Sequence, residues 1–345
     1  MAIKSKRSKW LIYGATGYSG KRIAQEAASR GYRPVLAARN GLAVKALAEQ
    51  LGLEWESFDL TDKSTLLNSF MQFSTVLNAA GPFVDTYAPV VAACLSAGTN
   101  YLDISGEVNV YEGLATNHTE ALAANLTVMP GVGFDMVPGD CLALSLKDEL
   151  PDATELSIGY SFDGTVSRGS ARTALATFSP ETLVRRGGKL VRLSAPMVRR
   201  FDFGPRSSAG SVDCYSMTFG DISIGWRTTS IPDVTSYLHV TKTFQDLATV
   251  NDMEALAQMP DGPGDQELST NQAFVVGEAL NLRGQVVRMR VQTPQVYAST
   301  FAFASAIAQR VHEGQIAPGF QTPAAVFGKT FILGFDGVTL ERLQA

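Results

Sequence analysis

Three glycines near the start of the chain stand at a spacing that suits a nucleotide-binding loop. Gly14, Gly17 and Gly20 follow a short apolar run and precede a helical pattern, in the segment LIYGATGYSGKRIA. In such a turn backbone N–H groups approach a pyrophosphate closely, and the helix dipole adds roughly half a positive charge there. Thr16 and Ser19 add hydroxyl groups to the same loop. The alternative is a plain turn before a helix, and the surrounding elements decide between the two.

The end of the second apolar run distinguishes between NAD and NADP. Units that bind NAD place Asp or Glu about 20 residues beyond the glycines, where the carboxylate accepts a hydrogen bond from the ribose 2′-OH. Here no acidic residue occurs between Glu26 and Glu49, and the run ends in Arg39 and Asn40. A guanidinium group can bind a 2′-phosphate through two parallel hydrogen bonds. The sequence therefore predicts NADP(H) as the cofactor and assigns Arg39 and Asn40 to its site; the alternative for Arg39 is a solvated side chain.

Two further strand ends carry residues that suit the same ligand. Asp59 ends the third apolar run, where it can meet the adenine edge, and the alternative is that it caps the helix beginning near Lys63. The segment NAAGPF, residues 78–83, follows the fourth run. Gly81 permits close backbone approach and Pro82 stiffens the turn, which suits a wall beside the nicotinamide ribose. A simple strand-to-helix turn explains these residues as well.

These residues belong to a regular alternation of apolar runs and helical patterns. We expect strands at 10–13, 34–38, 54–58, 74–79, 100–103 and 126–129. We expect helices at 18–30, 42–51, 63–72, 87–97 and 111–124. This β-α-β repetition predicts an α/β fold with a Rossmann-type doubly wound parallel sheet, whose ligands bind at the carboxyl ends of the strands. The glycine loop therefore stands where a phosphate site is expected.

Length and composition exclude several classes of protein. At 345 residues the chain exceeds one ordinary domain, and an apolar share of 45% predicts a folded protein. The net charge of −4 gives no reason to expect a nucleic-acid partner, and no apolar run is long enough for a membrane span. The odd number of cysteines and the isolated histidines favour a cytoplasmic protein with no disulfide framework and no metal. We expect the basic residues Lys4, Lys6, Arg7 and Lys9 to form a solvated end.

The pattern changes after Pro151, which marks the expected domain boundary. The elements expected beyond it are strands at 154–162 and 283–292, several short strands between 190 and 245, helices at 168–186 and 297–313, and a loop at 259–267. They predict a second domain of the α+β class over residues 151–313, while 314–345 return to complete the first domain, 1–150. The second domain is the candidate for substrate binding and for the contacts of a homodimer.

Basic residues concentrate in one part of the second domain. Between residues 165 and 230 there are ten basic residues against four acidic ones. Such an excess can attract a carboxylate, a CoA ester or an acidic carrier protein. Arg168 and Arg172 are one helical turn apart, so both could point at one anion. The alternative is a solvated face with no bound partner.

Several further segments carry recognisable motifs. They are NAAGPF at 78–83, YLDISGE at 101–107, GVGFDMVPGD at 131–140, SRGSARTAL at 167–175 and TPAAVFGKTF at 322–331. With them the chain resembles the saccharopine dehydrogenase-like oxidoreductases, and it is most similar to their trans-acting enoyl reductase-like branch. The resemblance implies an NADP-dependent Rossmann domain, a second domain on a mixed sheet, and hydride transfer to a C=C or C=N bond. By position, the family's dinucleotide contacts fall on Gly14, Thr16, Gly17, Tyr18, Ser19, Gly20, Arg39, Ala80, Gly81, Pro82 and Phe83.

The resemblance also indicates where the chemistry would take place. The family's pocket beside the nicotinamide is similar to the segments around Tyr101, Glu107 and Asp135. Hydride transfer needs a proton source near the reacting carbon, and we expect Glu107 and Asp135 in this role because each follows a strand end on the ligand side. We expect Tyr101, Arg168 and Arg172 to contact the substrate. A Tyr-x-x-x-Lys pattern is absent downstream of NAAGPF, which disfavours a short-chain dehydrogenase mechanism.

Three functions fit these residues. The first is NADPH-dependent reduction of a conjugated C=C bond in an anionic or thioester small molecule. The second is a saccharopine-type imine reductase or amino-acid dehydrogenase, although the sequence shows no recognisable set of amino-acid-binding residues. The third is a non-catalytic redox sensor that binds NADP(H) without turnover. The basic excess favours an anionic substrate and so the first two functions.

Overall fold

The chain forms two compact units in the computed structural model, which describes residues 7–177, 182–247 and 253–344. The first unit consists of Met1–Ser105, Glu112–Gly133 and Thr300–Gln321, and the second of Gly106–Tyr111, Phe134–Ser299 and Thr322–Ala345. We expected residues 106–111, 134–150 and 322–345 in the first domain and residues 300–313 in the second. The structure assigns all four segments differently.

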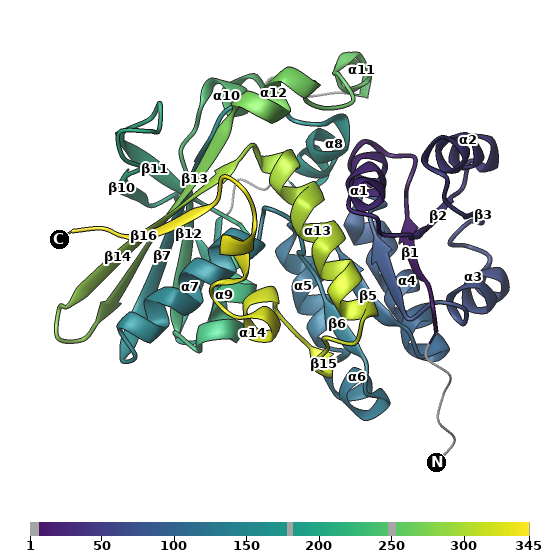
Figure 1. Ribbon diagram of the computed structural model, residues 1–345. Helices are drawn as coiled ribbons and strands as arrows, with labels where there is room; N and C mark the ends of the chain where they lie inside the picture. Colours follow the sequence, from purple (N-terminus) through teal and green to yellow (C-terminus); the bar gives the residue numbers. More distant parts are fainter. Residues whose placement is uncertain (1–6, 178–181, 248–252, 345) are drawn as a thin grey trace. The chain divides into compact units, whose positions relative to one another are not determined.

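The first unit is built on a parallel sheet of seven strands. Its strands are β1 (Trp10–Tyr13), β2 (Val35–Ala38), β3 (Trp55–Ser57), β4 (Thr75–Asn78), β5 (Asn100–Asp103), β6 (Thr127–Met129) and β15 (Gly319–Phe320). The spatial order is β15-β6-β5-β4-β1-β2-β3, and Figure 1 draws β1 to β4 in purple and blue. The strand order reverses between β1 and β4, and sheets of this kind bind ligands beside such a reversal. The predicted doubly wound sheet is confirmed.

Seven helices contribute to the first unit over its described residues. They are α1 (Tyr18–Ser29), α2 (Gly41–Leu51), α3 (Lys63–Phe70), α4 (Phe83–Ala97), the second half of α5 (Val108–Ala115), α6 (His118–Ala124) and the larger part of α13 (Val296–His312). The single helix expected at 111–124 is two helices, since Thr116 and Asn117 bond their side chains to carbonyl groups of the preceding turn. Trp10 Nε1 donates to Gln309 Oε1 at 3.0 Å, which holds the end of α13 against β1.

Side-chain caps fix the starts of two helices. Asn40 Oδ1 accepts the N–H of Ala43 at 3.1 Å, which caps α2. Asp62 Oδ1 accepts the N–H of Thr65 at 3.0 Å, which caps α3. The alternative role for Asp59, a cap on this helix, is therefore wrong.

The N-terminal basic cluster differs from expectation at Arg7. Its guanidinium group donates to the carbonyl oxygens of Phe73, Ala97 and Gly98 at 2.7–3.0 Å and to Thr99 Oγ1 at 2.7 Å. These carbonyls follow α3 and end α4, where helices leave acceptors unpaired and favour a cation. Arg7 is therefore a structural clamp and not part of a solvated end, whereas Lys4 and Lys6 lie outside the described residues.

The second unit is built on a mixed sheet of nine strands. They are β7 (Ala153–Phe162), β8 (Thr182–Arg186), β9 (Lys189–Leu193), β10 (Val198–Asp202), β11 (Ser211–Met217), β12 (Asp233–Leu238), β13 (Gln272–Asn281), β14 (Val286–Pro294) and β16 (Thr339–Arg342). β12 pairs in parallel with β7, while β13 pairs antiparallel with β7 and with β14. In Figure 1, β16 is the yellow strand beside β14. The mixed sheet implied by the resemblance is confirmed.

The helices of the second unit cover mainly one face of this sheet and its ends. They are α7 (Val137–Glu149), α8 (Arg168–Thr177), α9 (Asp221–Thr229), α10 (Lys242–Leu247), α11 (Met253–Gln258), α12 (Asp265–Thr270), α14 (Pro323–Phe327) and a short 3-10 helix at Phe331–Gly334. A Cβ on Gly277 of β13 would lie 2.6 Å from Leu146, which shows how closely α7 packs on the sheet. Throughout the described chain, no helix combines the length and apolar character needed to cross a membrane.

Three expectations about the second unit are corrected. The helix expected at 168–186 is wrong at its end, since α8 is described as far as Thr177 and β8 occupies 182–186; residues 178–181 lie outside the described part. The loop expected at 259–267 ends sooner, because α12 begins at Asp265. No strand was expected at 272–281, where β13 lies at the centre of the sheet.

Asp140 explains why the segments around α7 and α14 belong to the second unit. Its Oδ2 accepts the N–H of Ala324 at 2.7 Å, and Thr228 Oγ1 donates to its Oδ1. Thr228 and Thr322 share a hydrogen bond of 2.6 Å. One buried carboxyl group thus fastens α7, α9 and α14 to each other, which accounts for the motifs GFDMVPGD and TPAAVFG in structural terms.

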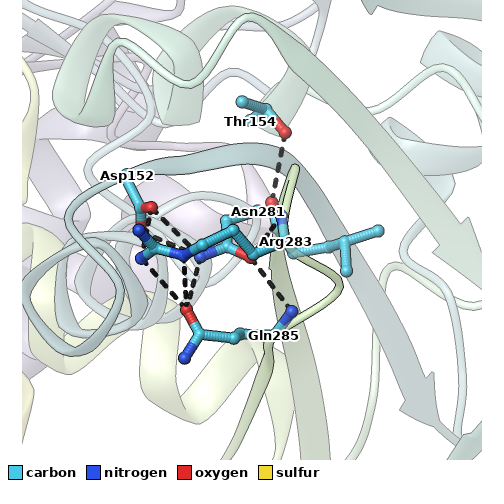
Figure 2. A network of polar contacts seen from close by, with 6 residues as sticks. Asp152, Thr154, Asn281, Arg283 and Gln285 are labelled. Atoms are coloured by element: carbon cyan, nitrogen blue, oxygen red, sulfur yellow. Dashed lines mark hydrogen bonds and ion pairs between the residues drawn. The ribbon is translucent and has the colours of Figure 1, made fainter.

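A second polar network closes the hairpin between β13 and β14. Figure 2 shows Asn281 at its centre, with Nδ2 donating to both carboxylate oxygens of Asp152 at 3.0 and 3.1 Å and to Gln285 Oε1 at 2.7 Å. Asn281 Oδ1 accepts the N–H groups of Arg283 and Gln285 at 3.1 and 3.0 Å. Arg283 also pairs with Asp152 at 2.7 Å. The network ties the hairpin turn to the connection between α7 and β7.

Candidate functional site

The glycine loop forms a tight turn between β1 and α1. Gly14 has a φ of +83°, and a Cβ there would lie 2.7 Å from the backbone nitrogen of Ala80. A Cβ on Gly20 would overlap the carbonyl oxygen of Gly14. The N–H groups of Gly14 and Ala15 donate to the carbonyl oxygen of Ala37 at 2.9 and 3.1 Å, which fixes the loop to β2. The turn itself therefore requires glycine at positions 14 and 20.

The third glycine, Gly17, is not required by the turn. Its φ of −73° suits any residue, and a Cβ there would meet only the carbonyl oxygen of Gly14, at 3.4 Å. Gly17 is the N-cap of α1, no side chain caps this helix, and Gly17 and Thr16 are exposed. An exposed helix start without a cap offers backbone N–H groups to an anion. The loop thus has the form of a pyrophosphate site.

Arg39 and Asp59 follow neighbouring strands of the sheet, β2 and β3. Ser57 Oγ donates to the carbonyl oxygen of Arg39 at 3.2 Å, which links the two strand ends. Two hydrogen bonds from Thr61 hold the pKa of Asp59 below its usual range, and the charge of Arg39 lowers it further. The Arg39 side chain is exposed, so its guanidinium group is accessible to a phosphate. Asn40 beside it differs, because its side-chain oxygen caps α2.

The turn after β4 is held by two residues to which the sequence reasoning gave no role. Asn78 is fully buried; its Oδ1 accepts the N–H of Ala80 at 3.1 Å and its Nδ2 donates to Thr86 Oγ1 at 3.2 Å. Thr86 Oγ1 in turn donates to the carbonyl oxygen of Ala80 at 2.7 Å. Gly81, Pro82 and Phe83 follow with partial or full exposure. Asn78 is a polar residue at the end of a buried strand, and this position was the signal that could have identified it as a residue that holds the turn.

Tyr101 is corrected from a substrate contact to a structural residue. Its side chain is 0% exposed, and its hydroxyl group donates to Asp103 Oδ2 at 2.7 Å. Asp103 Oδ1 accepts from the N–H and hydroxyl groups of Ser105 at 3.0 and 2.7 Å and from the N–H of Gly131 at 2.9 Å. Burial raises the pKa of Asp103, and these hydrogen bonds oppose the rise. Both side chains therefore fasten the ends of β5 and β6 and are closed to a ligand.

The two candidate proton donors meet at Gly106 in the second unit. The N–H of Gly106 donates to Glu107 Oε2 at 2.8 Å, and a Cβ on Gly106 would lie 2.8 Å from Asp135 Oδ2. Solvent reaches Asp135, yet the surrounding protein desolvates its carboxyl group and raises its pKa to about 6. A carboxyl group with this pKa can both hold and release a proton near neutral pH, as a general acid must.

A buried carboxyl group supports the backbone of Asp135. Tyr160 Oη donates to Asp221 Oδ1 at 2.7 Å and lies 3.5 Å from the carbonyl oxygen of Asp135. Ser236 Oγ donates to Asp221 Oδ2 at 3.0 Å, and burial raises the pKa of Asp221 to about 7. The sequence reasoning missed Tyr160 and Asp221, since they meet only through the assembled sheet.

The expected anion site at Arg168 and Arg172 remains a prediction. Arg168 donates to the carbonyl oxygen of Met259 at 2.8 Å and pairs with Asp261 at 3.0 Å, so its guanidinium group is engaged by a loop of its own unit. Arg172 is exposed. Arg168 therefore contacts a loop of its own unit, both side chains remain exposed, and an anion shared by them stays a prediction.

Much of the remaining basic excess is also engaged within the second unit. Arg199 forms an ion pair with Glu278, which also pairs with Arg288 at 2.6 Å. Arg200 pairs with Asp213 at 3.3 Å. The buried Arg185 lies 4.1 Å from the ring centre of a tryptophan, Trp226. In the described ranges there is no cluster of His, Cys, Asp and Glu that could hold a metal ion.

The geometry of the first unit defines a class of protein. A doubly wound parallel sheet with a glycine loop after its first strand and an exposed arginine after its second is a dinucleotide-binding unit of the Rossmann type. Residues 10–129 match the family model of the saccharopine dehydrogenase NADP binding domain. This part of the chain is thus similar to an NADP-binding domain of the saccharopine dehydrogenase type, in agreement with the predicted resemblance and the predicted cofactor.

Curated relatives align with about half of the chain. A trans-acting enoyl reductase of Mycobacterium bovis is 31% identical over 195 residues, which are 51% of this chain and 46% of that protein. A trans-acting enoyl reductase of Mycobacterium ulcerans is 30% identical over 148 residues, which are 41% of this chain and 35% of that protein. The alignments therefore span less than half the length of these relatives.

A solved structure shares the fold over nearly the whole chain. Apo histidine-tagged saccharopine dehydrogenase (L-Glu forming) from Saccharomyces cerevisiae has a TM-score of 0.65 at 15% identity, and the match covers 97% of this chain and 100% of that chain. At this identity the likeness concerns the fold, including the mixed sheet of the second unit.

Proposed function

We propose that this protein is an NADPH-dependent oxidoreductase that reduces a conjugated C=C bond of an anionic or thioester substrate. The observation that carries the proposal is the glycine loop, a turn without room for a Cβ at Gly14 or Gly20, within a segment that matches an NADP-binding domain. The relatives named trans-acting enoyl reductases favour C=C over C=N reduction. When bound, NADPH supplies the hydride.

The residues of the first unit would hold the cofactor by their places on the sheet edge. The N–H of Gly17 donates to the carbonyl oxygen of Gly14 at 3.1 Å, so the N–H groups of the first turn of α1 would bind the pyrophosphate, with Thr16, Tyr18 and Ser19 around it. Arg39 would bind the 2′-phosphate and Asp59 the adenine edge. The turn Ala80–Phe83, fixed by Asn78, would lie along the nicotinamide ribose.

The proton required by the reduction would come from Asp135. Asp135 is an exposed residue whose carboxyl group is desolvated by the surrounding protein, and its pKa of about 6 keeps a useful fraction protonated near neutral pH. Glu107, whose Oε2 accepts the N–H of Gly106, is the second carboxyl group beside this glycine. We assign Asp135 as the proton donor and keep Glu107 as the second candidate for this role.

The proposal is tested by NADPH consumption with crotonyl-CoA and with a cyclic imine, followed as a function of pH. Because the protonated form of Asp135 is the active one, kcat should fall about tenfold per pH unit above about pH 6, and Asp135→Asn should be slow and lack this slope. The variant should bind NADPH like the wild type, which shows that the first unit is intact. Turnover of the imine alone would favour a saccharopine-type reductase, and no turnover of either compound would favour an NADP(H)-binding sensor.

A further inference from the structure

The motif SRGSAR at the start of α8 builds a network of hydroxyl groups. Tyr297 Oη accepts the N–H of Ser167 at 2.8 Å and donates to Ser170 Oγ at 3.0 Å. Ser167 Oγ also donates to Ser170 Oγ, at 3.1 Å. The oxygen of Ser170 thus accepts two hydrogen bonds, and its own proton is left to point elsewhere. Because Ser170 is exposed, that proton is available to a ligand.

This network lies near the carboxyl group assigned as the proton donor. Tyr297 belongs to the second unit, as do Ser167, Ser170 and Asp135. Thr300, one turn after Tyr297 on α13, lies against Gly133, two residues before Asp135, since a Cβ on Gly133 would be 2.9 Å from the Thr300 side chain. Burial raises the pKa of Tyr297, and the charge of Asp135 raises it further. Tyr297 therefore stays protonated at neutral pH and can keep donating to Ser170. A hydroxyl donor and a carboxylic acid are accordingly present in one region of the same unit.

We propose that Ser170, held in place by Tyr297, donates a hydrogen bond to the carbonyl oxygen of the substrate. This inference rests on the proposed function and specifies its substrate as a thioester. When a hydride adds to the β-carbon of an enoyl thioester, the electron pair of the C=C bond moves towards the carbonyl oxygen, where negative charge develops. A preorganised donor aimed at that oxygen stabilises the charge. Ser170 is the catalytic residue of this pair and Tyr297 is a positioning residue.

Binding of the saturated thioester tests the contact without turnover. Isothermal titration compares butyryl-CoA with CoA itself, which lacks the carbonyl group, on wild type, Ser170→Ala, Ser170→Thr and Tyr297→Phe. We expect Ser170→Ala to weaken butyryl-CoA binding about tenfold and to leave CoA and NADPH binding unchanged. Ser170→Thr restores the hydroxyl group and should rescue the binding. The matched control is Ser269→Ala, because Ser269 is an exposed serine that bonds only to a carbonyl of its own helix.

Crotonyl-CoA reduction adds the catalytic readout. Ser170→Ala should lower kcat about 10²-fold, the usual cost of one oxyanion donor. Tyr297→Phe should cause a smaller loss, and the double variant should be no slower than Ser170→Ala, because Tyr297 acts through Ser170. Equal binding of butyryl-CoA to wild type and Ser170→Ala, or parallel loss of CoA binding, would overturn the inference, as would a wild type that binds neither compound. A wild type that binds butyryl-CoA through Ser170 but does not reduce crotonyl-CoA would overturn the proposed function alone.

Discussion

The two units assemble their candidate sites in different ways. In the first unit the loop at Gly14–Gly20, Arg39, Asp59 and the Ala80–Phe83 turn each follow their own strand, and backbone groups carry much of the expected binding. In the second unit the candidate proton donors come from separate segments of the chain. Glu107 accepts the N–H of Gly106, and the carboxylate of Asp135 lies beside the same glycine. The comparison teaches that a candidate cofactor site can be recognised from local sequence pattern, whereas a candidate catalytic site depends on tertiary packing.

The largest effect is expected from a substitution in the backbone-built site. In Gly20→Ala the new Cβ would collide with the carbonyl oxygen of Gly14, so the turn must shift. We expect NADPH affinity to fall more than about 100-fold and the melting temperature to drop, because overpacking costs about 1–3 kcal/mol. Fluorescence titration with NADPH and thermal unfolding measure the two effects.

Gly17→Ala is the matched comparison within the same loop. Its Cβ meets only one atom, at 3.4 Å, so the melting temperature should stay at the wild-type value while NADPH binding weakens through crowding of the phosphates. Gly264→Ala, with nothing within 4 Å of the new Cβ, should change neither quantity. Wild-type NADPH affinity in Gly20→Ala would contradict the assignment of the loop.

A smaller effect, and one that depends on pH, is expected in the second unit at Asp221. Burial raises its pKa in the folded state to about 7, so the folded state favours the protonated form. The associated stability is complete below the unfolded pKa of about 4 and is lost as pH rises through about 7. Asp221→Asn has no such titration, and Asn can still accept the hydrogen bond from Tyr160. Between about pH 5 and pH 8 the wild type should therefore lose on the order of 3 kcal/mol of unfolding free energy relative to the variant.

Urea unfolding of both proteins at the two pH values measures this difference directly. The effects of pH on other titrating groups cancel, because only the difference in unfolding free energy between variant and wild type is compared. If the difference in unfolding free energy stayed constant across the pH range, Asp221 would be ionised in the folded state. The group that supports the backbone of Asp135 through Tyr160 would then be a carboxylate and not a carboxylic acid.

The smallest effect is expected at the exposed Arg39. Arg39→Ala should weaken NADPH binding about 10- to 100-fold, since hydrogen bonds between charged groups contribute about 1.5–3 kcal/mol, and should leave NADH binding unchanged. Dissociation constants for both dinucleotides on wild type and variant provide the check. If the wild type bound NADH and NADPH equally well, the role given to Arg39 would be refuted.

Local pattern was enough to predict most of the first sheet and its loop. Strands at β1, β2 and β5 and the helix after Gly17 follow from short apolar runs and glycines, whose signals lie within a few residues of each other. Elements and contacts that depend on pairing between distant segments could not be predicted from the sequence. β13 contains Gly277 and the ion-paired Glu278, which break the strand pattern, and the partner of Arg168 is Asp261 in a distant loop. Tyr101 carries a polar hydroxyl group, and only the structure shows that this group is buried and bonded to Asp103.

The late strands impose an order on the synthesis of the molecule. β15, at Gly319–Phe320, completes the first sheet beside β6, and β16, at Thr339–Arg342, completes the second beside β14. A nascent chain that has not yet released Gly319 from the ribosome exposes one bare edge on each sheet, and such edges invite pairing with other chains. The two sheets are therefore completed at nearly the same point of the chain, although their first strands lie more than a hundred residues apart.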